Sequence, residues 1–300
     1  MDWPPGSFTD GGQGERDNHE MLPVNTVVNA FHCHALRLMS RISQALGNTD
    51  NQNRFSNQAN RVHNSINHLL FDHTQGIYVD GESSEHSSLH SNMFMLAFDL
   101  VPDDRKASVI SFVKSRGMAC SVYGAQYLLE ALYQNGEDQY ALEMMTAQHD
   151  RSWWNMIQCG STITMEAWDL KYKNNLDWNH AWGAAPANII PRFVLGVRPL
   201  EPGFSKVLIQ PQPGSLKHLS GTVPTIHGPV SVFLESIQAG SIQKLSVTIP
   251  AGTKAKIGLK LNNKNKANLL IDGKEADSHA ENKYLYVNDI NPGTHVLVYE

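Results

Sequence analysis

The spacing of apolar residues changes once along this 300-residue chain. Up to about residue 196, apolar side chains recur every three or four positions, which places them on one face of a helix. After Pro199 they alternate with polar residues in short runs bounded by Gly, Pro, Asn and Asp, which is typical of strands. We therefore expect two domains, a helical one over 1–196 and a β-rich one over 197–300, joined at the Pro/Gly-rich stretch GVRPLEPG.

The helical part consists of capped segments joined by short turns. In the first segment Val28, Phe31 and Met39 share one face, Gly47 is placed to end it, and Asn48 offers a cap for the next helix. Short connections between helices imply antiparallel pairs. The expected helices cover 25–46, 50–69, 88–100, 103–116, 122–136, 137–148 and 180–196, with a kink at Pro191 in the last one.

Small residues gather on two of these segments, at Ser87, Ser88 and Ser91 and again over 181–185. A helix with small or polar residues on one face and apolar ones on the other suits the inner ring of an α/α toroid. The inner helix ends of such a toroid surround a central pocket.

The second part alternates with the period of a strand. We expect a mostly antiparallel β-sandwich, because the runs are short and turn residues separate them at regular intervals. The predicted strands lie within 206–213, 228–238, 244–252, 255–262, 267–275, 283–290 and 294–300.

Composition excludes several classes of protein. A hydrophobic fraction of 41% with 18% charged residues fits a folded globular protein, and a net charge of -5 predicts neither nucleic acid nor an anionic membrane as a partner. No apolar run is long enough to span a bilayer, and MDWPPGSFTDGG lacks the features of a secretion signal, so the cellular compartment stays open. Without a CxxC pair, three cysteines are expected to be buried thiols: Cys33, Cys120 and Cys159.

The segment 160–204 has the highest density of residues that could act in catalysis or in sugar binding. Glu166 stands between small and apolar neighbours, with Trp168 close by and His180 further on. Aromatic faces beside a carboxylate suit a sugar site, and a carboxylate can move a proton at an anomeric carbon. A structural carboxylate paired with a neighbour is the alternative that composition alone leaves open.

The motifs GSTITMEAWD and WNHAWGAAP, with the downstream GVRPLEPGFSKVLIQPQPG, are similar to the signature of the α-L-rhamnosidases of glycoside hydrolase family 78. The opening DWPPGSFTDGGQGERDNHEMLPVNTVVNAFHCHAL resembles the middle of that family's catalytic barrel. The likeness runs from residue 1 to about 235. It implies part of an (α/α)6 six-hairpin barrel followed by an antiparallel β-sandwich.

The resemblance also implies an activity and site residues. The activity is inverting hydrolysis of terminal α-L-rhamnosides without a cofactor. The expected partner is a rhamnose-containing oligosaccharide, glycoside or polysaccharide, and association into a homo-oligomer is left open. Glu166 matches the general base, His180 a sugar-contacting histidine and Trp3 an aromatic wall of the rhamnose pocket. Three more substrate-binding candidates sit at ends of the expected inner helices: Trp182, Tyr123 and His90.

One departure from the family concerns the general acid. In the family it lies upstream of the Asp-Trp pair, with which this chain starts, and the expected helices are fewer than the twelve of a closed barrel. The chain is therefore expected to be a fragment that lacks the acid. An acidic group near its start, which holds Asp10, Glu15, Arg16 and Asp17, is expected to be loop.

Three other interpretations compete with this one. His86 and His90 have the spacing of metal ligands, but HSSLH lacks the glutamate of HExxH, so no metal is expected. The sandwich could bind sugar by itself, yet it contains no Trp. A lyase or hydrolase of uronic acids would need basic groups for the substrate carboxylate, and 160–190 offers only Lys171, Lys173 and His180.

Overall fold

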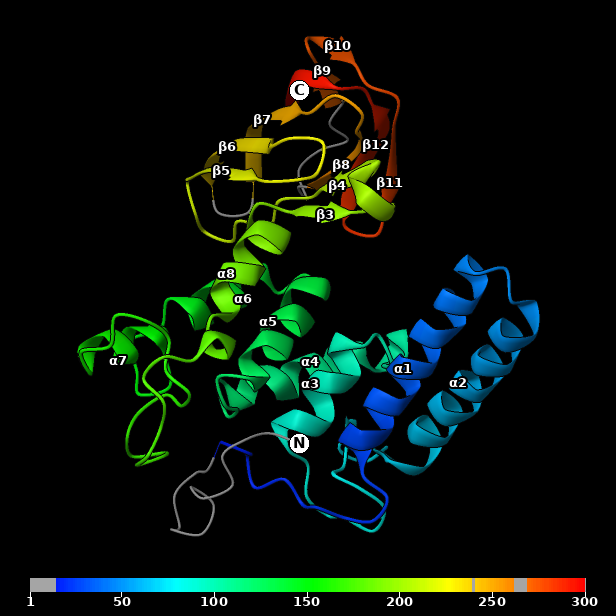
Figure 1. The fold of residues 1–300 in the computed structure, drawn as a ribbon, viewed down its shortest axis with the longest axis vertical. Coiled ribbons are helices and arrows are strands. Elements are labelled where there is room, and N and C mark those ends of the chain that lie inside the picture. The colour runs from blue at the N-terminus through cyan, green and yellow to red at the C-terminus, as the bar shows by residue number, and fades with distance from the viewer. Residues whose placement is uncertain (1–14, 239–240, 262–268, 300) are drawn as a thin grey trace. The chain divides into compact units, whose positions relative to one another are not determined.

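The computed structural model describes residues 15–238, 241–261 and 269–299 (Figure 1). The chain divides into two compact units. The first contains Met1–Asn135 and Met144–Ala185, and the second contains Gly136–Glu143 and Pro186–Glu300. No helix within the described ranges has the length and apolar character needed to cross a membrane.

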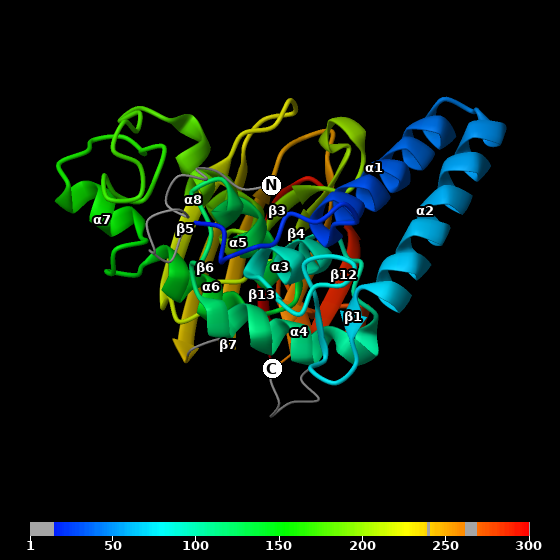
Figure 2. The same cartoon turned by 90° about the horizontal axis from the view of Figure 1, so that it is seen from below.

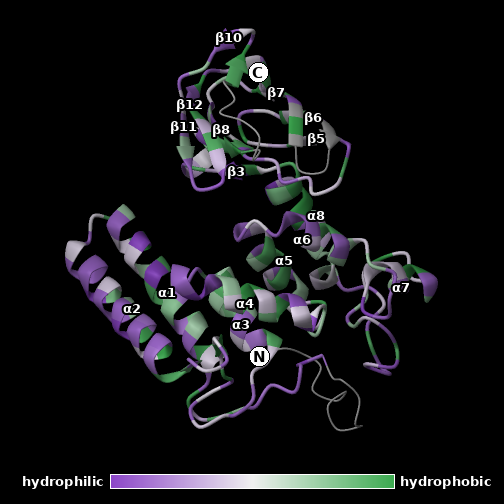
Figure 3. Ribbon diagram, turned by 180° about the vertical axis from the view of Figure 1, so that it is seen from behind, coloured by the Kyte–Doolittle hydropathy of each residue, from purple (hydrophilic) through white to green (hydrophobic). Residues whose placement is uncertain are grey.

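The first unit begins with a long antiparallel helix pair, α1 (Thr26–Ala45) and α2 (Thr49–Leu69). The two helices lie side by side in both views (Figures 1 and 2). Asn25 caps α1 through the backbone N of Val28, and Asn48 caps α2 through that of Asn51. Gly47 takes φ +70° between them, a conformation that glycine adopts without strain. Helix α2 is mostly hydrophilic along its length (Figure 3).

The interior of this unit is built around α3 (Leu89–Ala97), in which all nine residues are buried. It lies against α1, α4 (Asp103–Arg116) and α5 (Gly124–Gln134). Phe94 packs on Phe31 of α1 at 4.9 Å between ring centroids and on Tyr127 of α5 at 5.0 Å. Burial on every side fits an inner helix.

Two small elements of the first unit were not predicted. A hairpin of β1 (Phe71–Asp72) and β2 (Ile77–Tyr78) precedes α3, and the short helix α7 (Trp153–Gln158) follows residue 152. Both are too short to show a period. Helix α6 (Asp138–Met145) falls where a helix was expected, and most of it belongs to the second unit.

The expected helix over 180–196 is not continuous. It consists of a 3-10 turn (Ala181–Gly183), α8 (Ala185–Ile189) and a π-helical turn (Ile190–Val194). Pro191 lies in the π-helical turn, since proline has no N–H to donate and its ring displaces the preceding turn. The predicted kink is thus a change of helix type.

The second unit is a pair of sheets. In the part that the structure describes, one sheet has six strands in the order β10-β9-β13-β7-β6-β5 and the other has five in the order β11-β12-β8-β4-β3. All pairs are antiparallel except β4 with β8. The strands are β3 (Val197–Pro199), β4 (Lys206–Ile209), β5 (His218–Val223), β6 (Val230–Gln238), β7 (Ser241–Ile249), β8 (Lys254–Lys260), β9 (Leu269–Ile271), β10 (Lys274–Glu275), β11 (Ser278–Glu281), β12 (Tyr284–Ile290) and β13 (Gly293–Tyr299).

The core of the second unit is aliphatic. Alternate residues of the strands, such as Val207, Ile209, Leu245 and Ile257, are fully or almost fully buried. The predicted order of helical hairpins followed by antiparallel sheets is confirmed.

Candidate active site

Glu166 lies in the long connection between α7 and the turn at 181–183, and its carboxylate closes a loop. Its backbone N donates to the carbonyl of Asp177 at 2.9 Å, and the backbone N of Asp177 donates back to Oε2 at 3.0 Å. Oε2 also accepts a hydrogen bond from Nζ of Lys173 at 2.5 Å. Glu166 is only 8% exposed. The loop 167–176 is therefore tied at its base by the candidate catalytic side chain.

The surroundings of Glu166 favour its ionised form. Burial raises the pKa of this carboxyl, but the hydrogen bond from Lys173, the backbone N of Asp177 and the positive charges of Lys173 and His180 together hold the pKa below its usual range. An ionised carboxylate at neutral pH can accept a proton from water and cannot donate one. The geometry thus suits a general base.

Trp168, which belongs to the same loop, is packed in the interior. The ring is fully buried, its Nε1 donates to the carbonyl of Cys120 at 2.7 Å, and it meets Trp153 edge to face at 4.9 Å. Its backbone N donates to Oε1 of Glu15 at 3.4 Å. Glu15 is fully buried. Of the acidic group that was expected to be loop, Glu15, Arg16 and Asp17 do lie in turns, but Glu15 and Asp17 are packed into the interior; Asp10 lies outside the described residues.

Three of the predicted sugar-contacting residues meet in one aromatic cluster. Ring centroids are 5.5 Å apart for Tyr123 and His180, 5.1 Å for Tyr123 and Trp182, and 5.8 Å for His180 and Trp182. Trp182 is 71% exposed, so its face is open to a ligand. His180 is held by Thr164, whose carbonyl accepts from the backbone N of His180 at 2.8 Å. His180 and Trp182 follow Glu166 closely in sequence, and His180 contributes to lowering the pKa of Glu166.

The other two candidates are placed differently. His90 is fully buried at the start of α3, with its ring 6.2 Å from that of His19. Trp3 lies outside the described residues. Substrate contact by either residue stays a prediction.

A buried network around Asp80 lies next to His90 through His19 and was not predicted. Asp80 is fully buried and lies 3.1 Å from Nδ1 of His19 and 2.6 Å from Nδ1 of His86. Burial raises the pKa of Asp80, but the hydrogen bonds from His19, Ser88 and Ser91 and the charge of His19 outweigh it and lower that pKa. The network ties the chain before α1 to the start of α3. Across the described residues there is no group of three or more His, Cys, Asp or Glu placed to hold a metal ion.

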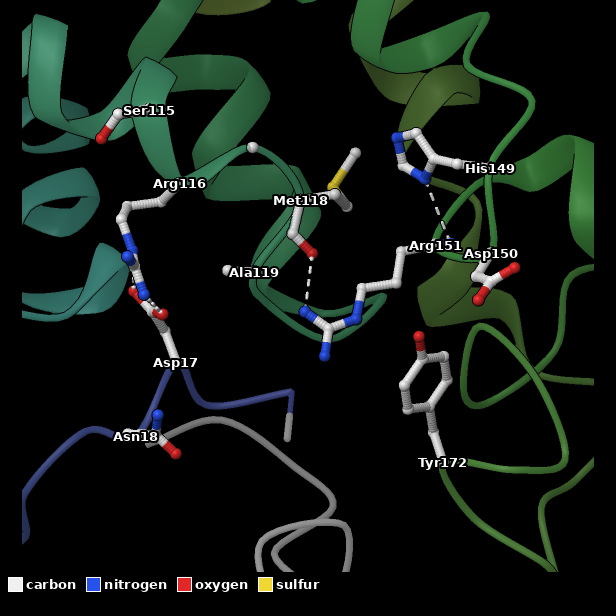
Figure 4. Close-up of a pocket in the computed structure, with 11 residues that line it drawn as sticks. Asp17, Asn18, Ser115, Arg116, Met118, Ala119, His149, Asp150, Arg151 and Tyr172 are labelled. Carbon is white, nitrogen blue, oxygen red and sulfur yellow. Dashed lines mark hydrogen bonds and ion pairs between the residues drawn. The ribbon is translucent and has the colours of Figure 1, made fainter. Parts of the chain in front are cut away.

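A polar pocket of about 650 Å³ lies in the first unit (Figure 4). Asp17 and Arg116 form one wall through a two-pronged ion pair, with Nε to Oδ2 at 2.9 Å. Arg151 lies opposite, with its guanidinium 4.9 Å from the centre of the Tyr172 ring. No motif marks these residues, because the pairing joins segments far apart in the sequence.

Comparisons with known proteins agree with this fold. A family model described as the bacterial alpha-L-rhamnosidase 6 hairpin glycosidase domain matches residues 1–194, and one for the C-terminal domain of these enzymes matches residues 196–271. The alpha-L-rhamnosidase of Alteromonas sp. (strain LOR) is 24% identical over 252 residues, which are 79% of this chain and 27% of that protein. That of Streptomyces avermitilis is 22% identical over 250 residues, 78% of this chain and 23% of that protein.

Solved structures show the same likeness of fold. The alpha-L-rhamnosidase of Dictyoglumus thermophilum has a TM-score of 0.76 at 20% identity, covering 89% of this chain and 31% of that one. The Streptomyces avermitilis alpha-L-rhamnosidase complexed with L-rhamnose has a TM-score of 0.74 at 19% identity, covering 96% of this chain and 28% of that one. This chain therefore spans about a quarter to a third of the length of these relatives.

Proposed function

This chain belongs to the bacterial α-L-rhamnosidase family of six-hairpin glycosidases, and we propose that Glu166 is its general base in the inverting hydrolysis of terminal α-L-rhamnosides. The observation that carries the proposal is the state of the Glu166 carboxylate, which is buried, hydrogen-bonded on Oε2 and ionised at neutral pH. In an inverting reaction the base takes a proton from the attacking water while an acid protonates the leaving oxygen. Glu166 fits the first role.

The sugar is proposed to lie against the cluster of Tyr123, His180 and Trp182. Trp182 is largely exposed, and a flat aromatic ring can cover the C–H face of a pyranose, while His180 and Tyr123 carry groups that hydrogen-bond to hydroxyls. Rhamnose has both an apolar face and several hydroxyls. A rhamnose-containing glycoside therefore matches the chemistry of the cluster.

The general acid is proposed to come from residues outside this sequence, as the resemblance implies. An inverting pair stands roughly 6.5–9.5 Å apart to admit a water molecule. Among the described carboxylates near the start of the chain, Glu15 accepts a hydrogen bond from the backbone N of Trp168, and Asp17 pairs with Arg116. The 300-residue chain alone is thus expected to show little or no turnover.

The test is hydrolysis of 4-nitrophenyl α-L-rhamnoside by this chain fused behind the preceding helices of the Alteromonas relative. Glu166→Gln should lower kcat on the order of 10²–10⁴-fold, and it should also lower the melting temperature, because Lys173 loses its buried charged partner. Glu143→Gln, on the exposed surface of α6, is the matched control and should have no effect. Near-normal turnover by Glu166→Gln would assign the base to another residue.

A non-catalytic role in sugar binding is the second candidate, and the exposed ring of Trp182 favours it. It predicts that the chain binds L-rhamnose while the fusion protein turns nothing over. Measurable hydrolysis that depends on Glu166 would decide against it.

A further inference from the structure

The two carboxylate oxygens of Glu166 have different surroundings. Oε2 accepts hydrogen bonds from Nζ of Lys173 at 2.5 Å and from the backbone N of Asp177 at 3.0 Å. Oε1 accepts none from the residues that the structure describes, and it is not one of the side-chain oxygens that the protein encloses completely. A carboxylate oxygen needs a free lone pair to accept a proton from water. Oε1 is therefore the oxygen that can do so.

Lys173 reaches Glu166 from within the loop that Glu166 itself closes. Its Nζ also donates to the carbonyl of Asn175 at 3.3 Å, and its side chain is only 17% exposed. Two acceptors thus fix the direction of the ammonium group. Because the Glu166 side chain is 10% exposed, water and salt screen the ion pair weakly. The positive charge therefore stays beside Oε2 as long as the loop keeps this conformation.

Lys173 is the main group that opposes the effect of burial on Glu166. Burial raises the pKa of this carboxyl, and the hydrogen bond from Lys173 is the largest of the effects that lower it. His180 is the second positive group that favours the ionised form. Among the described residues, Lys173 makes the one direct ion pair with Glu166.

The carboxylates near Glu166 do not take this ammonium group. Asp177 bonds Glu166 through its backbone N. Asp169 accepts a hydrogen bond from the side chain of Asn155 at 2.9 Å. Glu15, which is fully buried, accepts one from the backbone N at position 168. Their negative charges would favour a protonated Glu166 if Lys173 were absent.

We propose that Lys173 is a positioning residue of the hydrolysis: it holds Oε2 of Glu166, keeps the carboxylate charged as the pH falls, and leaves Oε1 to take the proton from water. The proposal rests on the proposed function and deepens it, because it names the group that sets the acid limit of the reaction. Water gives one proton to Oε1 while its oxygen bonds to the anomeric carbon and the glycosidic C–O bond breaks. The leaving oxygen takes its proton from the general acid outside this sequence, and Lys173 keeps all of its own protons.

The first measurement is a pH titration of the 300-residue chain, in which ¹³C NMR follows the carboxyl carbon of Glu166. Its resonance is identified as the one that Glu166→Gln removes. In Lys173→Met this carbon should titrate at higher pH than in the parent, and in Lys173→Arg close to the parent, because arginine restores a positive donor. Lys171→Met is the matched control, since Lys171 lies in the same loop but pairs with Asp150. An unchanged titration in Lys173→Met would overturn the role of Lys173.

The second measurement is kcat against pH for the fusion protein with 4-nitrophenyl α-L-rhamnoside. Lys173→Met should lower kcat about tenfold at about pH 5 but less than about threefold at about pH 8, so the acidic limb moves to higher pH. Lys173→Arg should return the limb toward that of the parent, and Lys171→Met should leave it in place. An equal loss at every pH would mean a purely structural role and overturn the proposal. If the NMR titration moves and the limb does not, Lys173 still sets the charge of Glu166, but Glu166 is not the base and the proposed function fails.

Discussion

Replacing Lys173 with methionine tests how one ion pair sets the state of Glu166. The Nζ to Oε2 distance is 2.5 Å, and the two side chains are 17% and 10% exposed, so water screens the pair weakly. Glu166 would keep the hydrogen bond from the backbone N of Asp177. A charged group that loses one of two partners costs about 1–3 kcal/mol, less than the 3–5 kcal/mol of a fully orphaned buried charge. We expect the variant to lose about 2 kcal/mol of unfolding free energy at neutral pH.

The loss should depend on pH in a definite direction. The folded state lowers the pKa of Glu166, so the stabilisation is complete above the ordinary glutamate pKa of about 4.3 and disappears as the pH falls through the lower folded value. Without Lys173 burial still raises this pKa and less opposes it, so the carboxyl accepts a proton at higher pH. The difference between parent and variant should therefore be largest near neutrality and shrink in acid.

Urea unfolding at about pH 7 and about pH 3 measures both quantities. Lys171→Met is the matched control, because Lys171 pairs with Asp150 where the side chains are 49% and 65% exposed. An exposed pair contributes about 0–1 kcal/mol, so this variant should change little at either pH. An equal loss for Lys173→Met at both pH values, or an equal loss for the two lysine variants, would refute the reasoning.

Three further outcomes follow from the packing. Asp80→Asn should cost about 3–5 kcal/mol of unfolding free energy, because His19 and His86 lose a buried charged partner. Thermal unfolding measures this loss, and Asp99→Asn, at an exposed carboxylate, is the control. Gly196→Ala should cost about 3 kcal/mol of unfolding free energy, measured in urea, since a Cβ would meet the Gln210 carbonyl at 2.1 Å. Gly273→Ala is the control: its φ is +76° but nothing lies within 4 Å of the added Cβ, so it should cost only about 1–2 kcal/mol. The chain should self-associate through Val28 and Ile42 on α1 and Leu46 directly after it, which are 57%, 51% and 77% exposed, and sedimentation should show Ile42→Glu with Leu46→Glu to be more monomeric.

The order of elements could be predicted because it depends on local periods and caps. Helix α1 ends before Gly47 and α2 begins after Asn48, as expected from residues that act within their own turn. The exceptions have local causes too. The six residues of α7 and the two-residue strands of the β1–β2 hairpin are too short for a period, and Pro191 changes the helix type over 190–194.

The candidate site, too, could be predicted only where its residues lie in local motifs or at predicted helix ends. Glu166 and His180 stand in two neighbouring motifs, so the sequence was enough to nominate them, and Trp182 and Tyr123 joined them as predicted helix ends. Nothing local identified Lys173 as the partner of Glu166, although it is only seven residues away, because the loop must first close between Glu166 and Asp177.

Partners far apart in sequence could be assigned only in the folded chain. Asp17 meets Arg116 across 99 residues, and Glu15 meets the backbone of Trp168 across 153 residues. A sequence shows which carboxylates and guanidinium groups are present, but it does not show which of them form ion pairs, because each has several possible partners. Packing of α3 against α1, α4 and α5 brings particular ends together, and burial then makes an unpaired charge too costly to tolerate. The sequence by itself predicted helical hairpins followed by antiparallel sheets and nominated the catalytic candidate, because these depend on local periods and motifs. The tertiary structure alone decided which charges surround that candidate, because only packing fixes which distant segments lie within reach of one another.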